Sequence, residues 1–361
     1  MLIVDSHEDL AWNMLTFGRD YTRSASDTRR LEVNSGIPSY NDDTLLGWPD
    51  YQRGRVGVIF ATLFATPIRK QLGDWETQCY QDSEQAYRLY NQQLDAYHRL
   101  TEKHRDKFCL IVHNDDLDSV LTDWDGAGED QNSPVGLVIL MEGAEAIRDP
   151  RELDMWWERG LRLIGPAWAG TRFCGGTREP GPLTKEGFAL LGAMSDLGFG
   201  LDLSHMDEQA ALQAIDIYEG HIFASHSNAL ALLENSDSNR HLTDRQIHGL
   251  LERDAVIGVV LYNRYLNGGW RKGDPRDQVT LEHVVAQIDY ICQIAGDAQH
   301  VGIGSDFDGG LGLQSVPMNI ETVADIRLLA PLLNLRGYSD DDIAGIFSQN
   351  WIRLLRKILP E

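Results

Sequence analysis

The sequence predicts one α/β domain of the (β/α)8 barrel class, spanning residues 1–361 and carrying insertions in the loops that follow its strands. Eight apolar, β-type runs recur along the chain, and segments with helical spacing separate most of them, which is typical of a parallel sheet with right-handed crossovers. A chain of 361 residues suits this class. Five of the eight runs end in a histidine, aspartate or glutamate, and a barrel of this class places all such ends on one face.

Four of the predicted strands lie in the first half of the chain. Their apolar runs are nearly continuous, as expected of strands that are buried on both faces. They occupy residues 2–4, 55–63, 135–141 and 161–166. A helix start at 10–14 and a short extra strand at 108–113 accompany them. Helical spacing of apolar residues predicts two further helices, at 75–104 and at 115–121, the second capped by Asn114.

The second half of the chain supplies the other four strands and their crossovers. These strands are predicted at residues 198–204, 221–225, 255–261 and 301–305. Apolar spacing predicts helices at 184–197, with Thr184 as its cap, and at 208–218, 243–251 and 281–294. A helical segment at 340–359 is rich in leucine and isoleucine, and we expect it to pack against the flank of the barrel.

Three segments lack apolar periodicity and are predicted as loops. They are a polar excursion at 16–49, an acidic stretch at 123–134 and a glycine-rich loop at 167–182. The sequence contains no internal repeat, low-complexity tract or linker that would divide it. A single domain with long loops is therefore the expected organisation.

The composition argues against several classes of partner. Hydrophobic residues make up 42% of the chain and charged residues 24%, as in a folded globular protein. The formal net charge of -23 repels phosphate backbones and anionic lipid surfaces, so we expect neither nucleic acid nor membranes as partners. A small molecule is the expected partner, and a homodimer is one assembly that the sequence allows.

The cysteines and the first residues predict a cytoplasmic protein. The four cysteines are scattered without a C-x-x-C pair and are predicted to be reduced thiols. They are Cys79, Cys109, Cys174 and Cys292. The chain reaches Asp5 and His7 almost at once, unlike a secretory signal, and no stretch is long and apolar enough to span a bilayer. Because the cysteines do not form a metal-binding pair, any metal must be held by histidine, aspartate and glutamate.

The residues at the strand ends have the side chains of metal ligands. His7 and Asp9 follow the first strand, and the alternation along a strand sends both to the same side. Glu142 follows the third strand, His205 the fifth and His226 the sixth. Imidazole nitrogens and carboxylate oxygens are normal ligands of zinc-like ions. Each residue taken singly is more often a hydrogen-bonded structural residue, but their shared place at strand ends favours a metal site.

Two neighbouring divalent ions need a carboxylate between them, because a neutral imidazole does not offset the repulsion of two cations. Glu142 is the only glutamate at a predicted strand end, so we assign it this bridge. The two earlier ligands would complete one zinc site, and the two later histidines the other. A water shared by the ions would become a hydroxide nucleophile. Asp306, at the end of the eighth strand, would accept its proton and pass it to the leaving amine, which predicts metal-assisted hydrolysis of an amide or ester.

The same segments carry a family resemblance. The opening DSHEDLAWN resembles the D-x-H-x-D-L-P-W-N of the renal or membrane dipeptidases, peptidase family M19 of the amidohydrolase superfamily. LMEGAEAI is similar to the bridging-glutamate segment of that family, DLSH and SHSN to its two later histidine ligands, and GSDFDGG to its catalytic-aspartate segment. These segments run in the family order from Asp5 to Gly310. The resemblance implies a dizinc barrel enzyme that cleaves dipeptides, often with a D-residue at the C-terminal position.

The resemblance also implies substrate contacts. It gives the same zinc ligands and the same proton shuttle as the residues themselves, and it adds Arg240. In NSDSNRHLTD, Arg240 matches the family arginine that holds the terminal carboxylate of the substrate, and a guanidinium fork suits that two-oxygen target. From the residues alone, a surface ion pair near Asp244 is an equal alternative. Tyr262, in LYNRY, is a further candidate for substrate contact.

One position departs from the family pattern. Renal-type members have a histidine in a T-L-T-H segment at the end of the fourth strand, where it contacts the substrate carbonyl, and here LIGPAW puts Trp168 in its place. An indole donates one hydrogen bond but does not bind zinc. The oxyanion contact is therefore lost, moved to a group in the loop at 167–182, or made by the N–H of Trp168.

Three functions are compatible with these observations. The leading hypothesis is a zinc-dependent dipeptidase. The divergent loop around Trp168 motivates a second hypothesis, in which the same site acts on a lactone or an N-acyl amino acid. The third is a non-catalytic metal-binding barrel, against which Asp306 argues, because a structural site does not need a proton shuttle.

Overall fold

Eight parallel strands form the barrel of this protein, in a computed structural model. The model describes residues 1–126, 132–234, 236 and 238–361. Neighbouring strands pair in the order β11-β10-β7-β6-β2-β1-β13-β12. The strands are β1 (Ile3–Glu8), β2 (Val56–Phe64), β6 (Val135–Glu142), β7 (Leu161–Gly165), β10 (Gly200–Asp202), β11 (Ile222–Phe223), β12 (Ile257–Val259) and β13 (Val301–Ile303).

The barrel closes between β11 and β12. Ala224, directly after β11, forms a parallel bridge with Ile257, and its N–H donates to the carbonyl of Val256. The predicted (β/α)8 barrel is therefore confirmed, and the carboxyl ends of its strands lie at one end. The predicted extra strand is β5 (Phe108–Leu110), which pairs with β6 outside the barrel order.

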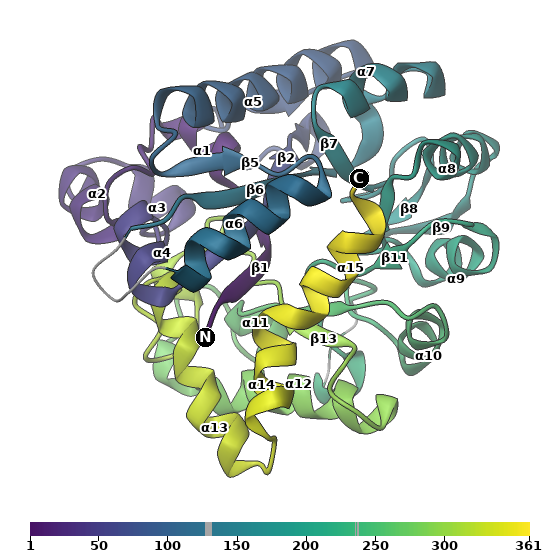
Figure 1. The fold of residues 1–361 in the computed structure, drawn as a ribbon. Helices are drawn as coiled ribbons and strands as arrows, with labels where there is room; N and C mark the ends of the chain where they lie inside the picture. Colours follow the sequence, from purple (N-terminus) through teal and green to yellow (C-terminus); the bar gives the residue numbers. More distant parts are fainter. Residues whose placement is uncertain (127–131, 235, 237) are drawn as a thin grey trace.

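Helices surround the sheet and connect successive strands (Figure 1). The helices that connect successive strands are α5 (Ser83–Lys103), α6 (Asn114–Gly126), the short α7 (Leu153–Glu158), α8 (Lys185–Leu197), α9 (Glu208–Ile217), α10 (Asp244–Glu252) and α12 (Leu281–Ala295). The other helices are α1 (Leu10–Phe17), α2 (Ala25–Glu32), α3 (Ile37–Asn41), α4 (Trp48–Gly54), α11 (Asn263–Leu266), α13 (Leu329–Leu335), α14 (Asp340–Ala344) and α15 (Asn350–Ile358). Across the described ranges, no helix combines the length and apolar character that a membrane crossing requires.

The polar excursion predicted at residues 16–49 is partly helical and is tied to the barrel by a buried ionic network. It contains α2, α3 and the start of α4. Arg19 donates through Nη1 to Oδ2 of Asp308 at 3.1 Å, and through Nε and Nη2 to the two carboxylate oxygens of Glu32. Two hydroxyl groups of the excursion also donate to Asp308. The network therefore anchors the excursion to the loop that follows β13, because an unpaired buried charge would be strongly destabilising.

The helix predicted at 75–104 is wrong at its start. The structure begins it at Ser83, because Asp82 caps the helix by accepting from the N–H of Gln85 at 2.8 Å. Two short strands pair before it, β3 (Thr66–Pro67) and β4 (Cys79–Tyr80). Apolar spacing does not reveal the position of a helix cap, which explains the error.

Of the two predicted helix caps, one is confirmed and the other is wrong. Thr184 caps α8 by accepting from the N–H of Gly187 at 3.1 Å. Asn114 is instead the first residue of α6, and its Nδ2 donates to the carbonyl of Leu359 at 2.9 Å. Asp116 accepts from two backbone N–H groups just before the helix, which ties the first turn of α6 to the segment that precedes it.

The other two predicted loops also contain regular structure. The helix α6 extends to Gly126 and so includes the start of the acidic stretch 123–134, whose residues 127–131 lie outside the described residues. The glycine-rich loop 167–182 forms most of an antiparallel hairpin, β8 (Cys174–Gly176) and β9 (Glu179–Leu183). This hairpin follows β7 and lies beside the strand ends.

The C-terminal helix crosses one end of the barrel instead of packing on its flank (Figure 1). Trp351 of α15 packs edge-on against Phe60 and Phe223, with ring centroids 5.2 and 6.0 Å away. Phe60 belongs to β2 and Phe223 to β11, which three strands separate in the sheet order. The indole of Trp351 therefore fills the space between opposite walls of the barrel.

Candidate metal centre

Six side chains meet at the carboxyl ends of the strands, and they are the ones that the sequence predicts as ligands and proton shuttle. They are His7, Asp9, Glu142, His205, His226 and Asp306. They form three overlapping groups, and the ligand atoms of each group lie within 4.8 Å of one another. Five of the six residues are buried and Asp306 is partly exposed. The predicted convergence is therefore present in the structure.

Glu142 lies between His7 on one side and the pair His205 and His226 on the other. Its Oε1 is 3.0 Å from Nε2 of His205 and 3.3 Å from Nε2 of His226. Its other oxygen, Oε2, is 3.7 Å from Nε2 of His7. The same His7 nitrogen is 3.6 Å from Oδ2 of Asp9. The two oxygens of one carboxylate thus face separate ligand sets, which is the arrangement that a bridge between two cations requires.

Burial and neighbouring charges set the protonation of the cluster. Burial, followed by nearby cationic groups, lowers the pKa of His205 and of His226 well below 6.5, so both rings are neutral. Burial also acts to lower the pKa of His7, but the carboxylates around it, first that of Glu142, raise this pKa to about 10. Burial raises the pKa of Glu142 well above its ordinary value and the pKa of Asp306 to about 7.

The cluster fits metal ions. It brings three carboxylates and three imidazoles into one largely buried volume. Within the described part of the chain, Nε2 of His7 and Oδ1 of Asp9 are buried without a hydrogen-bond partner. Such atoms are rare in folded proteins. Divalent cations would satisfy these atoms and offset the negative charge, and the nitrogen and oxygen donors present are the ones that such cations bind.

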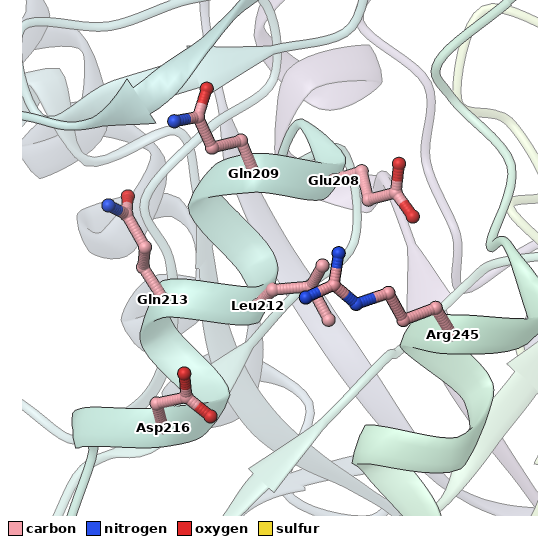
Figure 2. Close-up of a pocket in the computed structure, with 6 residues that line it drawn as sticks. All are labelled: Glu208, Gln209, Leu212, Gln213, Asp216 and Arg245. Carbon is pink, nitrogen blue, oxygen red and sulfur yellow. The ribbon is translucent and has the colours of Figure 1, made fainter.

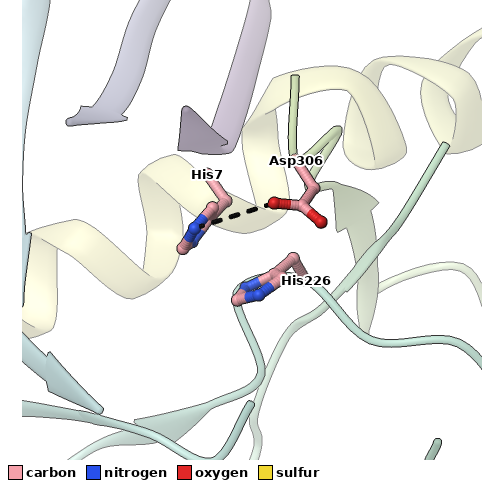
Figure 3. Close-up of side chains that lie close together, drawn as sticks. All are labelled: His7, His226 and Asp306. Carbon is pink, nitrogen blue, oxygen red and sulfur yellow. Dashed lines mark ion pairs between the residues drawn. The ribbon is translucent and has the colours of Figure 1, made fainter. Parts of the chain in front are cut away.

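Two residues of the cluster have a left-handed backbone. His205 has φ of 66° and Asp306 has φ of 63°. This conformation is uncommon for residues other than glycine and recurs at functional sites. The N–H of Asp306 donates to the carbonyl of His7 at 3.2 Å, which ties the turn to β1. Figure 3 shows His7, His226 and Asp306 converging, with Oδ1 of Asp306 4.0 Å from Nε2 of His7.

Gly309 leaves room for two of the carboxylates. A Cβ at this position would collide with Oδ1 of Asp306 and would lie 2.7 Å from Oδ2 of Asp9. Any other residue at position 309 would therefore displace the backbone or the carboxylates of Asp306 and Asp9. The first glycine of the final pair in GSDFDGG is thus required by the packing of the cluster itself.

Arg240 is buried behind His226. Its Nη2 donates to the carbonyl of His226 at 2.5 Å and its Nη1 to Oγ of Ser227 at 3.1 Å. The guanidinium lies over the ring of Tyr265, 5.4 Å from the centroid. Its Nε has no partner among the residues that the structure describes. This buried position argues against a surface ion pair near Asp244, and the substrate contact of Arg240 stays a prediction.

Trp168 and Tyr262 lie near the cluster. Trp168 is half-buried and packs against Phe64, with ring centroids 5.0 Å apart, and its ring centroid is 6.3 Å from that of His205. Tyr262 packs edge-on against Tyr265, the same ring that Arg240 covers. The roles of Trp168 and Tyr262 as substrate contacts stay predictions.

A separate cavity of about 290 Å³ lies between α9 and α10 (Figure 2). Its lining consists mainly of long polar side chains, namely Glu208, Gln209, Leu212, Gln213, Asp216 and Arg245. None of these residues belongs to the ligand cluster. The cavity is therefore separate from the ligand cluster.

Comparison with known proteins identifies the family. The model of the membrane dipeptidase family, peptidase family M19, matches residues 1–359. The chain belongs to this family. It is 31% identical over 362 residues to dipeptidase aclJ of Aspergillus oryzae, a match that covers 98% of this chain and 77% of that protein.

Two solved structures share the fold of this M19 protein. The dipeptidase AC, a metallopeptidase of family M19, has a TM-score of 0.79 at 24% identity, covering 100% of this chain and 99% of that one. A metallopeptidase of Rhodobacter sphaeroides, liganded with a phosphinate mimic of the dipeptide L-Ala-D-Ala, has a TM-score of 0.79 at 23% identity and covers 99% of each chain. As an M19 member the protein is a metal-dependent hydrolase, which argues against the non-catalytic barrel.

Sequence reasoning missed the hydroxyl groups that hold the histidines of this M19 protein. Thr177, between β8 and β9, has its Oγ1 2.9 Å from Nδ1 of His205. Ser225 has its Oγ 2.7 Å from Nδ1 of His226. The segment SHSN contained a signal for Ser225, because this serine directly precedes the histidine. Thr177 comes from a loop without a periodic pattern, so no local signal pointed to it.

Proposed function

We propose that this M19 protein is a dizinc dipeptidase. In this proposal His7 and Asp9 hold one ion, His205 and His226 hold the other, and Glu142 bridges them. The observation that carries it is the placement of the two Glu142 oxygens against separate imidazoles. A donor set of imidazoles and carboxylates without thiolates suits a catalytic zinc site. The dipeptide mimic bound by the Rhodobacter metallopeptidase supports dipeptides as substrates, including those with a C-terminal D-residue.

The proposed reaction divides between the ions and the residues. When bound, the ions would lower the pKa of a water and polarise the scissile carbonyl. Asp306 accepts the proton of the attacking water and transfers it to the nitrogen of the leaving amine. Burial raises the pKa of Asp306 to about 7, which suits a group that takes up and releases a proton near neutral pH. Arg240 holds the substrate carboxylate and so fixes the position of the amide bond.

A combined metal analysis and dipeptide screen tests this proposal. The zinc-loaded protein should contain two ions per chain and should cleave members of a panel of L,L and L,D dipeptides. A chelator should abolish the activity and added zinc should restore it. Fully metallated protein that cleaves no member of the panel would reject the proposal.

Replacing Arg240 by alanine is expected to weaken dipeptide hydrolysis through substrate binding. A charge-assisted contact to the substrate carboxylate contributes roughly 2–3 kcal/mol, so KM for dipeptides should rise by about 100-fold. Steady-state kinetics with dipeptides and with their C-terminal amides measure this effect. The amides should be poor substrates of the unmodified enzyme and should respond little to the substitution.

The control for this prediction is Arg240→Lys, which keeps the charge but not the planar fork. Lysine should recover part of the KM change. Equal losses for dipeptides and amides would instead assign Arg240 to a structural role behind His226, whose carbonyl it contacts.

A lactone or an N-acyl amino acid is the second candidate substrate. The observation in its favour is Trp168, which replaces the family histidine next to His205. A kcat/KM above that for every dipeptide would favour this candidate. Dipeptides and their N-acetylated counterparts share the carboxylate, so comparing the two separates a requirement for the free amine from a requirement for the carboxylate.

Binding of the ions is expected to release protons. In the metal-free protein the pKa of His7 is about 10, so its ring is protonated at neutral pH and an incoming ion must displace that proton. Each displaced proton contributes about tenfold per pH unit, so the apparent affinity should rise at least this steeply from neutral pH toward the His7 pKa. Isothermal titration calorimetry in buffers of different ionisation enthalpy measures the release. An affinity that is flat over this range would contradict the prediction.

A further inference from the structure

A buried chain of hydrogen bonds runs from Asp202 through Ser225 to His226. Ser225 donates its hydroxyl to Oδ2 of Asp202 at 2.5 Å, and the same Oγ lies 2.7 Å from Nδ1 of His226. Asp202 is 2% exposed and Ser225 is 0% exposed, so water does not compete for these contacts. Asp202 and Ser225 are outside the proposed ligand set, and the reaction described above does not use them.

The direction of these bonds follows from the protons available. One oxygen of Asp202 accepts from two backbone N–H groups, those of Ser204 at 3.0 Å and of Ser225 at 2.8 Å. The other oxygen accepts the single proton of the Ser225 hydroxyl. The Ser225 oxygen must then accept from His226, which places the ring proton on Nδ1. Nε2 of His226 then carries no proton. It lies 3.3 Å from Oε1 of Glu142 and 2.9 Å from Nε2 of His205, so its lone pair faces the cluster.

The position of Ser225 is itself fixed. The Oγ of Ser6 lies 2.5 Å from the backbone carbonyl oxygen of Ser225 and 2.8 Å from that of Ile303, so its single proton is shared between these two acceptors. These contacts hold the end of β11 against β13 and β1. The Ser225 Oγ also lies 3.5 Å from Nδ1 of His7. One hydroxyl therefore borders a histidine from each half of the cluster.

We propose that Asp202 and Ser225 are positioning residues that set the tautomer of His226 and thereby the affinity of the cluster for its ions. An imidazole binds a metal through the nitrogen that lacks a proton, and the partner of the other nitrogen decides which one that is. The relay keeps Nε2 of His226 without a proton before an ion arrives. This inference rests on the proposed function, since it requires that the cluster bind ions.

Asp202→Asn tests the direction of the relay, because the two side chains have the same shape. The amide oxygen keeps the two backbone N–H donors, so the amide nitrogen faces Ser225 as a donor. Ser225 must then donate to Nδ1 of His226, which moves the ring proton to Nε2. We expect zinc affinity to fall roughly 100-fold, whereas Ser225→Ala, which removes the partner without imposing the wrong tautomer, lowers it about tenfold.

The affinities are measured on the full chain, stripped of metal, by competition for zinc with a chromophoric chelator. The matched control is Asp50→Asn, a buried aspartate of α4 that accepts from the N–H of Ala25 outside the cluster. The relay is supported if Asp202→Asn loses more zinc affinity than both Ser225→Ala and the control. The relay is overturned if the loss of zinc affinity in Asp202→Asn fails to exceed that of Ser225→Ala or fails to exceed that of the control. Unmodified protein that binds no zinc would instead overturn the proposed function, and the relay with it.

The ring proton provides a second readout that needs neither activity nor a variant of Asp202 or Ser225. In the metal-free protein labelled with ¹⁵N-histidine, the signal of His226 is identified by its absence in His226→Gln. We expect the proton of this ring on Nδ1. A proton on Nε2 would overturn the proposal, because a packing role alone selects neither nitrogen.

Discussion

Glu142→Gln is expected to remove most of the bound metal and to lower kcat/KM for dipeptides by at least about 10³-fold, beyond the loss seen for a single electrostatic contact. An amide has one acceptor oxygen, whereas the structure places an oxygen of Glu142 against His205 and the other against His7. One ligand set must then face an N–H₂ group. Metal analysis and steady-state kinetics measure the two effects.

The loss is not expected to come from unfolding. Burial raises the pKa of Glu142, so a neutral side chain of the same shape removes a desolvation penalty from the metal-free protein. Its melting temperature should not fall. Glu145→Gln is the matched control, because this glutamate follows the same strand but accepts from the N–H of Arg172. A Glu142→Gln variant that holds two ions would contradict the assignment of the bridge.

Asp306→Asn is expected to lower kcat by about 10²- to 10⁴-fold while metal content and KM change little. Asparagine cannot accept the proton of the attacking water, which is the role proposed for Asp306. The substitution suits the backbone, because asparagine tolerates the left-handed conformation seen here, with φ of 63°. Kinetics and metal analysis on one preparation separate the loss of a proton acceptor from the loss of a ligand.

The control for Asp306→Asn is Asp216→Asn. Asp216 is exposed on α9 and lines the separate cavity of Figure 2. It should leave kcat unchanged. A metal content that falls in parallel with kcat in Asp306→Asn would make Asp306 a required ligand and would contradict its assignment as proton shuttle alone.

Local signals explain why much of the fold could be predicted from the sequence. Strands such as β2 and β6 are buried on both faces, so their apolar runs are unbroken and easily found. The excursion at 16–49 has no such signal, because its helices are polar and are held by distant partners such as Asp308. The helix start near residue 75 was misplaced because apolar spacing does not reveal a cap.

The candidate ligands were predictable for a related reason. His205 and His226 each directly follow a predicted strand, and the geometry of a (β/α)8 barrel then brings them together whatever the intervening sequence. Their orienting partners were not predictable. Thr177 lies in the turn between β8 and β9, and Asp202 acts on His226 only through Ser225, which follows a different strand.

The amino-acid sequence by itself determined the barrel class and the six side chains at its strand ends, because apolar periodicity and ligand chemistry are properties of short segments. Tertiary structure alone decided which oxygen of Glu142 faces which imidazole, how Ser225 orients His226, and that Trp351 fills one end of the barrel. These features depend on distances between segments that are far apart in sequence. Barrel closure sets those distances, and no local pattern encodes them.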